Sequence, residues 1–173
     1  ERRQAHCQAV CKLALELLHG LQQRMQGERG EQGEQGEQNP RNGVDVLADL
    51  PSPALLKAAA LIHDVAKGGR THDMLGASWA RLRNWHSVAA LIRAHMDIFF
   101  LDEPKLNGPA LLFLADKAVK GSQRVGVTEN FKASLERFKN DEEARKAIER
   151  RQQRARELLN LVEEQLGSLP ELH

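Results

Sequence analysis

Apolar residues recur three and four positions apart along almost the whole chain, which is the spacing of one face of an α-helix. The first such segment predicts a helix over residues 2–25. Further segments with the same period predict helices over about 54–66, 72–82, 88–96, 109–120, 128–139 and 141–166. No convincing alternation of apolar and polar residues, the mark of a half-buried strand, occurs between them. The pattern therefore predicts an all-α fold, a bundle of six to seven helices.

Residues that commonly begin or end helices lie between these apolar segments. Ser52 is a good N-cap, and Pro53 after it fits the first helical position. That helix is apolar on most of its faces, so we expect it in the middle of the bundle, ending at Gly68-Gly69. Ser87 and Asn107 are expected to begin two later helices.

Residues 27–43 break the helical pattern with a glycine at every third place in their first part. The spacing is that of collagen, but the run has only four triplets, without proline in them, and is too short for a triple helix. Its polar composition favours a flexible loop that carries no chemistry.

The net charge and hydropathy of the chain argue against two classes of function, nucleic-acid binding and membrane spanning. The chain has 173 residues, enough for one domain with a sizeable core, and a formal net charge of +1. This charge gives no strong attraction to nucleic acid, and no apolar run approaches the roughly 18 residues that span a bilayer. Cys7 and Cys11 are expected to be reduced core residues, which favours a cytoplasmic protein. Because the chain begins at Glu1, we expect a fragment of a longer protein or a processed chain.

Four residues spread along the chain carry side chains suited to one metal ion. His63-Asp64 closes the apolar helix that Ser52 begins, and Asp116 lies within an otherwise apolar helix. Buried polar groups are costly without partners, so both segments are expected to face a cation. Together with His6 near the start of the first helix, they offer two imidazoles and two carboxylates, which leave positions open for water.

Two more histidines, His72 and His95, lie at a helix start and a helix end in the same region. They could hold a second ion, with Asp64 bridging the two. One or two divalent ions are therefore expected, among Fe, Mn, Ni, Co, Zn and Mg. The other histidines, which are expected to be ordinary hydrogen-bonding groups, are His19, His86 and His173.

The order H…HD…H…H…D of these residues resembles that of the HD-domain metal-dependent phosphohydrolases. HDVAKG (63–68) looks like the family's HD turn, and THDMLGA (71–77) looks like its next histidine block. VAALIRAHMD (88–97) and LADKAVKG (114–121) resemble the later blocks. The resemblance covers about residues 2–125. The order of the motifs is similar in particular to that of the HD-type hydrolases that cleave diadenosine tetraphosphate, and the chain also resembles HD domains fused to nucleotidyltransferases.

The resemblance implies an HD-domain bundle over residues 1–125 that acts as a phosphohydrolase. A metal-activated water would cleave a phosphate ester or anhydride of a nucleotide or other small phosphorylated molecule. Asp64 and Lys67 would be catalytic, and Lys67, Lys117 and Arg124 would bind the substrate. The alternative is a non-catalytic HD domain that binds metal and nucleotide for regulation, as part of a larger nucleotidyltransferase fusion.

Residues 126–173 mix acidic and basic side chains on every turn, which favours charged helices that pack on the same domain. Their apolar residues could instead pack on a second subunit and form a homodimer. The basic residues there that could meet a phosphorylated ligand or a partner chain are Arg150, Arg151 and Arg154. Asp97 is a candidate to orient His95, or a simple loop residue.

Overall fold

The computed structural model describes residues 1–31, 50–69, 71–100 and 103–173, which form seven α-helices, one hairpin and one short 3-10 helix. The α-helices are α1 (Arg2–Glu31), α2 (Pro53–Ile62), α3 (His72–Arg81), α4 (His86–Ala94), α5 (Gly108–Lys117), α6 (Val127–Arg137) and α7 (Glu142–Leu166). The remaining elements are β1 (Val119–Lys120), β2 (Gln123–Arg124) and the 3-10 helix η1 (Pro170–Leu172). The predicted all-α bundle of six to seven helices is therefore confirmed.

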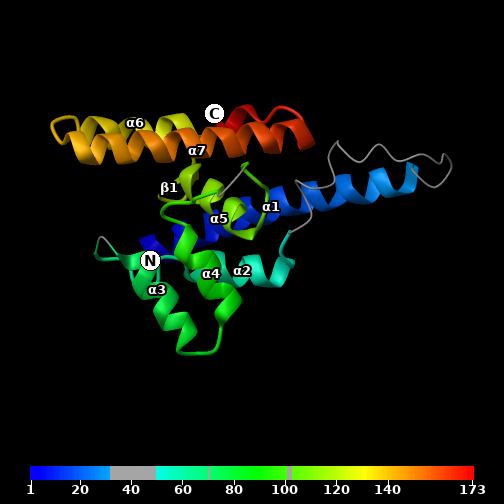
Figure 1. Cartoon of the computed structure of the whole chain (residues 1–173), viewed down its shortest axis with the longest axis horizontal. Helices are drawn as coiled ribbons and strands as arrows, with labels where there is room; N and C mark the ends of the chain where they lie inside the picture. Colours follow the sequence, from blue (N-terminus) through cyan, green and yellow to red (C-terminus); the bar gives the residue numbers. More distant parts are fainter. Residues whose placement is uncertain (32–49, 70, 101–102) are drawn as a thin grey trace.

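The helices form three layers. Figure 1 shows α1 and α5 in the middle, α6 and α7 together on one side, and α2, α3 and α4 on the other. The core between the layers is apolar: Phe113 of α5 is its largest fully buried side chain, and Val10 and Leu21 of α1 are equally buried. Leu158 of α7 belongs to the same cluster, so the C-terminal helices share this core. No helix in the described ranges is both long enough and apolar enough to cross a membrane.

The predicted position of α2 in the middle of the bundle is wrong. α5 lies there instead, whereas α2 buries one face and leaves Leu61 39% exposed. The apolar character of α2 on most of its faces comes largely from alanines, whose small side chains gain little from burial. An apolar pattern made of alanine is therefore compatible with a helix at the side of the bundle.

Local capping chemistry places two helix starts where they were predicted. Ser52 accepts a hydrogen bond from the Leu55 backbone N–H, and Asn107 accepts one from the Ala110 N–H. The predicted N-cap Ser87 is wrong, because α4 begins at His86, two residues before the predicted position 88, and has Trp85 at its N-cap without a side-chain cap.

The helix ends depart further from the sequence expectations. α1 continues to Glu31, so the first five residues of the predicted loop 27–43 are helical, and residues 32–43 lie outside the described ranges. Gln, Glu and Arg are good helix formers, although each glycine among them costs about 1 kcal/mol relative to alanine. α2 ends at Ile62 rather than Ala66, and α5 ends at Lys117, where the unpredicted β1–β2 hairpin begins. Two-residue strands are too short to show a period in sequence.

Close packing of α3 on α4 positions two histidines of the candidate site. Gly76 of α3 faces Ile92 of α4 so closely that an added Cβ would lie 3.2 Å from the Ile92 Cγ2 atom. Ala77, Ala80 and Ala89 complete a small apolar contact between the two helices. The start of α3 and the end of α4 are thereby brought together, and these are the positions of His72 and His95.

Candidate metal centre

The structure brings all six predicted ligand residues to one place, at the ends of five helices. His6 comes from the N-terminal part of α1, and His63-Asp64 follows α2 directly. His72 is the first residue of α3, His95 is the C-cap of α4, and Asp116 lies in the last turn of α5. His63, Asp64 and His95 are at most 2% exposed. Residues that are distant in sequence thus form one buried polar cluster.

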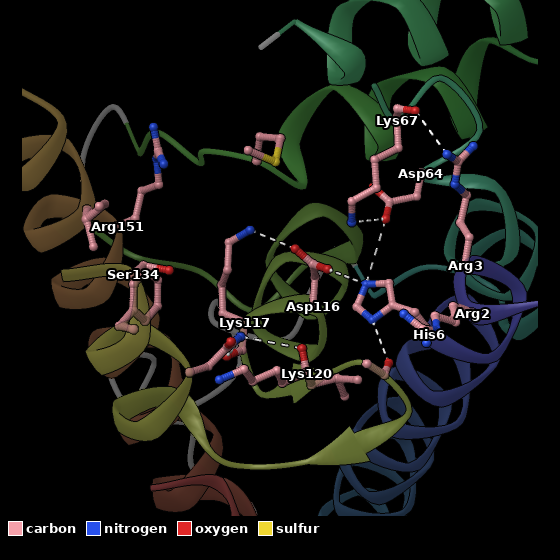
Figure 2. A pocket seen from close by; sticks show the side chains of 16 residues that line it. Arg2, Arg3, His6, Asp64, Lys67, Asp116, Lys117, Lys120, Ser134 and Arg151 are labelled. Atoms are coloured by element: carbon pink, nitrogen blue, oxygen red, sulfur yellow. Dashed lines mark hydrogen bonds and ion pairs between the residues drawn. The ribbon is translucent and has the colours of Figure 1, made fainter. Parts of the chain in front are cut away.

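Two histidines and two carboxylates form one half of the cluster. His6 Nε2 lies 3.1 Å from Asp116 Oδ1, and His63 Nε2 lies 3.4 Å from the same oxygen. Both Nε2 atoms lie 3.9 Å from Asp64 Oδ2. Figure 2 shows His6, Asp64 and Asp116 pointing toward one another. His6, His63 and Asp64 are therefore compact enough to hold one ion, and Asp116 adjoins the same space through its contacts with the two imidazoles.

The other carboxylate oxygen of Asp64 faces the second pair of histidines. Asp64 Oδ1 lies 3.4 Å from His72 Nε2 and 3.7 Å from His95 Nε2. The two Nε2 atoms are 3.2 Å apart. Two ligand groups, His6 with His63 and Asp64, and Asp64 with His72 and His95, are thus compact enough to hold an ion each, and they share Asp64.

The backbone fixes the orientation of all four imidazoles. In each ring Nδ1 lies 2.6–3.0 Å from a carbonyl oxygen, which can only accept a hydrogen bond, so Nδ1 carries the proton and donates it. The accepting carbonyls for His6, His63, His72 and His95 belong to Gly121, Ala60, Gly69 and Ile92, respectively. A neutral ring held in this way presents the lone pair of Nε2 to the cluster, which is how metal-binding histidines are oriented.

With the proton on Nδ1, several hydrogen-bond acceptors of the cluster face one another. The Nε2 atoms of His72 and His95 are both acceptors, as are His6 Nε2 and the Asp116 oxygen that it meets. His63 Nε2 is buried and has no hydrogen-bond partner among the described residues. Such contacts are repulsive unless a proton or a cation lies between them. The donor set, imidazole nitrogens with carboxylate oxygens, fits a divalent transition metal.

The electrostatics keep both carboxylates ionised. Burial opposes the charge of Asp116, but the Lys117 ammonium and contacts from His6 and His63 hold the pKa of this carboxyl well below its usual range. Burial likewise opposes the charge of Asp64, and contacts with His95 and Lys67 hold its pKa low. Burial lowers the pKa of His63, but contacts with Asp116 and Cys7 outweigh it and raise this pKa to about 10. Both carboxylates therefore stay ionised, and without metal a proton on His63 occupies part of the space that a cation would otherwise fill.

Helix ends add to the attraction for cations. His63 and His95 are the C-caps of α2 and α4, and Asp116 lies one residue before the end of α5. The C-terminus of a helix carries a partial negative charge from its free carbonyl groups. Three such ends point at the cluster, which favours an ion of positive charge there.

The predicted substrate-binding residues divide into two groups. Lys67 forms an ion pair with Asp64 Oδ2, and Lys117 Nζ lies 2.7 Å from Asp116 Oδ2 and donates to the His95 carbonyl. Both lysines therefore lie at the cluster. Arg124 pairs with Glu16 of α1 instead, and it is outside the set of residues that line the neighbouring cavity.

Asp97 does not orient His95, because the Nδ1 atom of His95 donates to Ile92. The Asp97 carboxylate lies 2.5 Å from Arg154 Nη1 and 3.7 Å from Arg151 Nε, so it joins the end of α4 to α7. Of the histidines expected to be ordinary, His19 contacts Gln23, His173 contacts Glu163, and His86 is exposed at the start of α4.

A cavity of about 520 Å³ opens beside the cluster, and His6, Asp64 and Asp116 form part of its wall. This volume is in the usual range for a small-molecule site. The sequence interpretation missed three further basic residues of the lining, Arg2, Arg3 and Lys120. Exposed cations carry no signal in sequence that distinguishes a binding residue from a solvated one. Lys120 is placed by the hairpin, which was itself unpredicted.

No protein-family model matches the chain, and no solved structure matches it either. The membership of the HD-domain family therefore stays a prediction from the motifs. The structure itself shows buried histidine and aspartate groups that could hold a metal ion, and these groups lie next to a basic cavity.

Proposed function

We propose that this protein is a metal-dependent phosphohydrolase that uses water to cleave a phosphate ester or anhydride of a nucleotide or other small phosphorylated molecule. The observation that carries the proposal is the position of Asp64, whose two oxygens each face a different pair of histidines. A carboxylate shared in this way is suited to bridge two ions. The resemblance of the motifs to HD-domain phosphohydrolases supports the same conclusion.

The residues divide between two ions. His6, His63 and Asp116 would hold one, His72 and His95 would hold the other, and Asp64 would contact both. A pair of bound divalent ions supplies an activated water and stabilises charge on the phosphoryl oxygens. The imidazole-rich donor set favours Mn, Fe, Co, Ni or Zn over Mg, which prefers oxygen ligands.

Lys67 and Lys117 are suited to respond to the filling of the site. Each ammonium is paired with a carboxylate of the cluster, Lys67 with Asp64 and Lys117 with Asp116. When these carboxylates bind divalent cations, their attraction for the ammonium groups falls. Both lysines line the cavity, so they could then donate charge-assisted hydrogen bonds to phosphate oxygens. Lys67 would stabilise the charge that develops during cleavage.

A hydrolysis assay on the purified chain tests the proposal. The protein is loaded with Mn, Fe, Co, Ni or Zn and given p-nitrophenyl phosphate and a panel of nucleotides, and the cleavage products are separated by anion-exchange chromatography. Asp64→Ala and His63→Ala should each lower the rate more than about 100-fold, beyond the effect of changes outside the ligand shell. Asp73→Asn is the matched control, because Asp73 is also buried and paired, with Arg93, but lies outside the two ligand groups.

Two outcomes contradict the proposal. In the first, the metal-loaded protein hydrolyses no compound of the panel. In the second, Asp64→Ala hydrolyses a compound at the rate of the control. Nucleotide binding that requires metal but leads to no hydrolysis would instead favour the regulatory alternative.

A further inference from the structure

The cavity beside the cluster holds more positive charge than one phosphate group requires. Its lining has two acidic side chains, Asp64 and Asp116, which belong to the cluster. The six basic side chains of the lining are Arg2, Arg3, Lys67, Lys117, Lys120 and Arg151. Two of these cations are paired with the two carboxylates, so four remain in excess. Filling the cluster with divalent ions would increase this excess.

The excess cations lie on two opposite walls. Figure 2 shows Arg2 and Arg3 on one side of the cavity, Ser134 and Arg151 on the other, and Lys117 between them. On the first wall, the Arg3 guanidinium donates to the Lys67 carbonyl, so it is tied to the loop that follows α2. On the far wall, the polar groups come from α6, α7 and the hairpin, and the hairpin also reaches the cluster, because its Gly121 carbonyl accepts from His6.

The far wall has donors that the described residues leave unused. Arg151 Nε is buried without a hydrogen bond there; it forms only a long ion pair, 3.7 Å, with Asp97 Oδ2, while Arg154 binds the other oxygen of Asp97. Lys120 is exposed to the cavity, and no described carboxylate forms an ion pair with it. No described residue hydrogen-bonds the Ser134 hydroxyl, which lines the same wall. A buried donor without a partner costs free energy unless a ligand satisfies it.

We infer that Lys120, Ser134 and Arg151 form a second anion subsite, and that the substrate is a small molecule with two separate anionic groups. One group is the phosphate that is cleaved at the cluster, and the other is a phosphate or carboxylate bound at the far wall. This inference rests on the proposed function for the identity of the first group. It assigns the C-terminal helices a role in substrate selection, because α6 and α7 supply two of the three side chains.

Binding of non-hydrolysable ligands tests the subsite independently of catalysis. Metal-loaded protein is titrated by calorimetry with alkane diphosphonates of two to six carbons and with the alkyl monophosphonate of the same chain length. At the best chain length, the diphosphonate should bind about 10- to 100-fold more tightly, the range expected for added charge-assisted hydrogen bonds. Arg151→Met and Lys120→Met, which keep the apolar stem and remove the charge, should each reduce this ratio about tenfold.

Arg150→Met is the matched control, because Arg150 is the exposed neighbour of Arg151 on α7 and does not line the cavity. It should keep the ratio of the wild type. Metal content measured after each titration shows whether the diphosphonate has removed the ions. Should Arg151→Met unfold, the exposed Lys120→Met variant decides the result alone.

The outcomes separate the two proposals. Equal affinity for diphosphonate and monophosphonate at every chain length overturns the subsite, even if the protein hydrolyses phosphate esters. A preference that survives in both Arg151→Met and Lys120→Met also overturns it. A preference that depends on these residues in a protein that hydrolyses nothing supports the subsite and contradicts the phosphohydrolase.

Discussion

Replacement of Asp64 by asparagine should strongly reduce the stabilisation of the protein by metal. The substitution keeps the shape of the side chain but removes its charge and replaces one of the two oxygens, which face different histidine pairs, by an NH2 group that cannot bind metal. A change at one residue should therefore weaken both halves of the cluster. His72→Ala, by contrast, removes a ligand from one half only, and it should keep part of the response.

The size of the effect follows from mass action. At a metal concentration about 100 times its dissociation constant, binding stabilises the fold by about 2.7 kcal/mol. For a chain of 173 residues this corresponds to a rise in Tm of about 5–11 °C. If Asp64→Asn weakens binding about 100-fold, the same concentration stabilises the fold by only about 0.4 kcal/mol. The rise in Tm should then shrink to about 1–2 °C.

Thermal unfolding followed by circular dichroism, with and without Mn, measures this difference for the wild type and each variant. Asp73→Asn is again the control, because it removes a buried, paired carboxylate outside the two ligand groups. It should lower Tm without metal and keep the metal-induced rise. The reasoning is refuted if Asp64→Asn shows the full rise, or if Asp73→Asn loses it to the same extent.

Three other properties of the chain can be measured directly. His72→Ala or His95→Ala should lower the metal content after dialysis from about two ions per chain to one; unchanged content would contradict a second ion. In the folded chain without metal, the pKa of His63 is about 10, above the ordinary value of 6.5. Protonation of His63 therefore stabilises the fold fully below pH 6.5, and this stabilisation should fall as the pH rises toward 10. Urea titrations should show this fall in the free energy of unfolding. They should also show that the stabilisation by metal grows with pH, because the histidines bind metal only when their Nε2 atoms are deprotonated. Phe113→Ala should cost about 3–5 kcal/mol by urea unfolding, whereas Phe99→Ala, 74% exposed, should change stability by less than about 0.5 kcal/mol.

Local chemistry explains which parts of the fold the sequence predicts well. Ser52 and Asn107 begin helices because a side-chain oxygen and a following proline act within one turn, without help from the rest of the chain. The end of α2 depends on distant residues instead. His63 and Asp64 follow the last helical residue, where their side chains can meet α1, α4 and α5. No local pattern encodes that requirement.

The cluster and the cavity differ in the same way. A histidine or aspartate within an apolar segment is conspicuous in sequence, because its burial needs a partner, and this predicted His63, Asp64 and Asp116. The other three ligand residues, His6, His72 and His95, were predicted from their places at helix starts and ends and from the order of all six along the chain. The cations of the cavity lie in polar segments, where a basic residue is ordinary. Arg124 was predicted to bind substrate, but it pairs with Glu16, whereas Lys120, which was missed, lines the cavity. Arg151 also lines the cavity, and the sequence did not distinguish it from Arg150 and Arg154. The positions of Lys120 and Arg151 depend on a hairpin and on the packing of α7, which emerge only in the folded chain.

The central claim is that two ions bind on either side of Asp64. Anomalous diffraction from crystals of the Mn-loaded protein tests it most directly. We expect two peaks about 3.5–4 Å apart, one beside His6, His63 and Asp116 and the other beside His72 and His95, with Asp64 contacting both. Ligand distances of about 2.0–2.3 Å should accompany each peak. A loaded protein without an anomalous peak at this cluster, or with its peaks at other residues, would contradict the account.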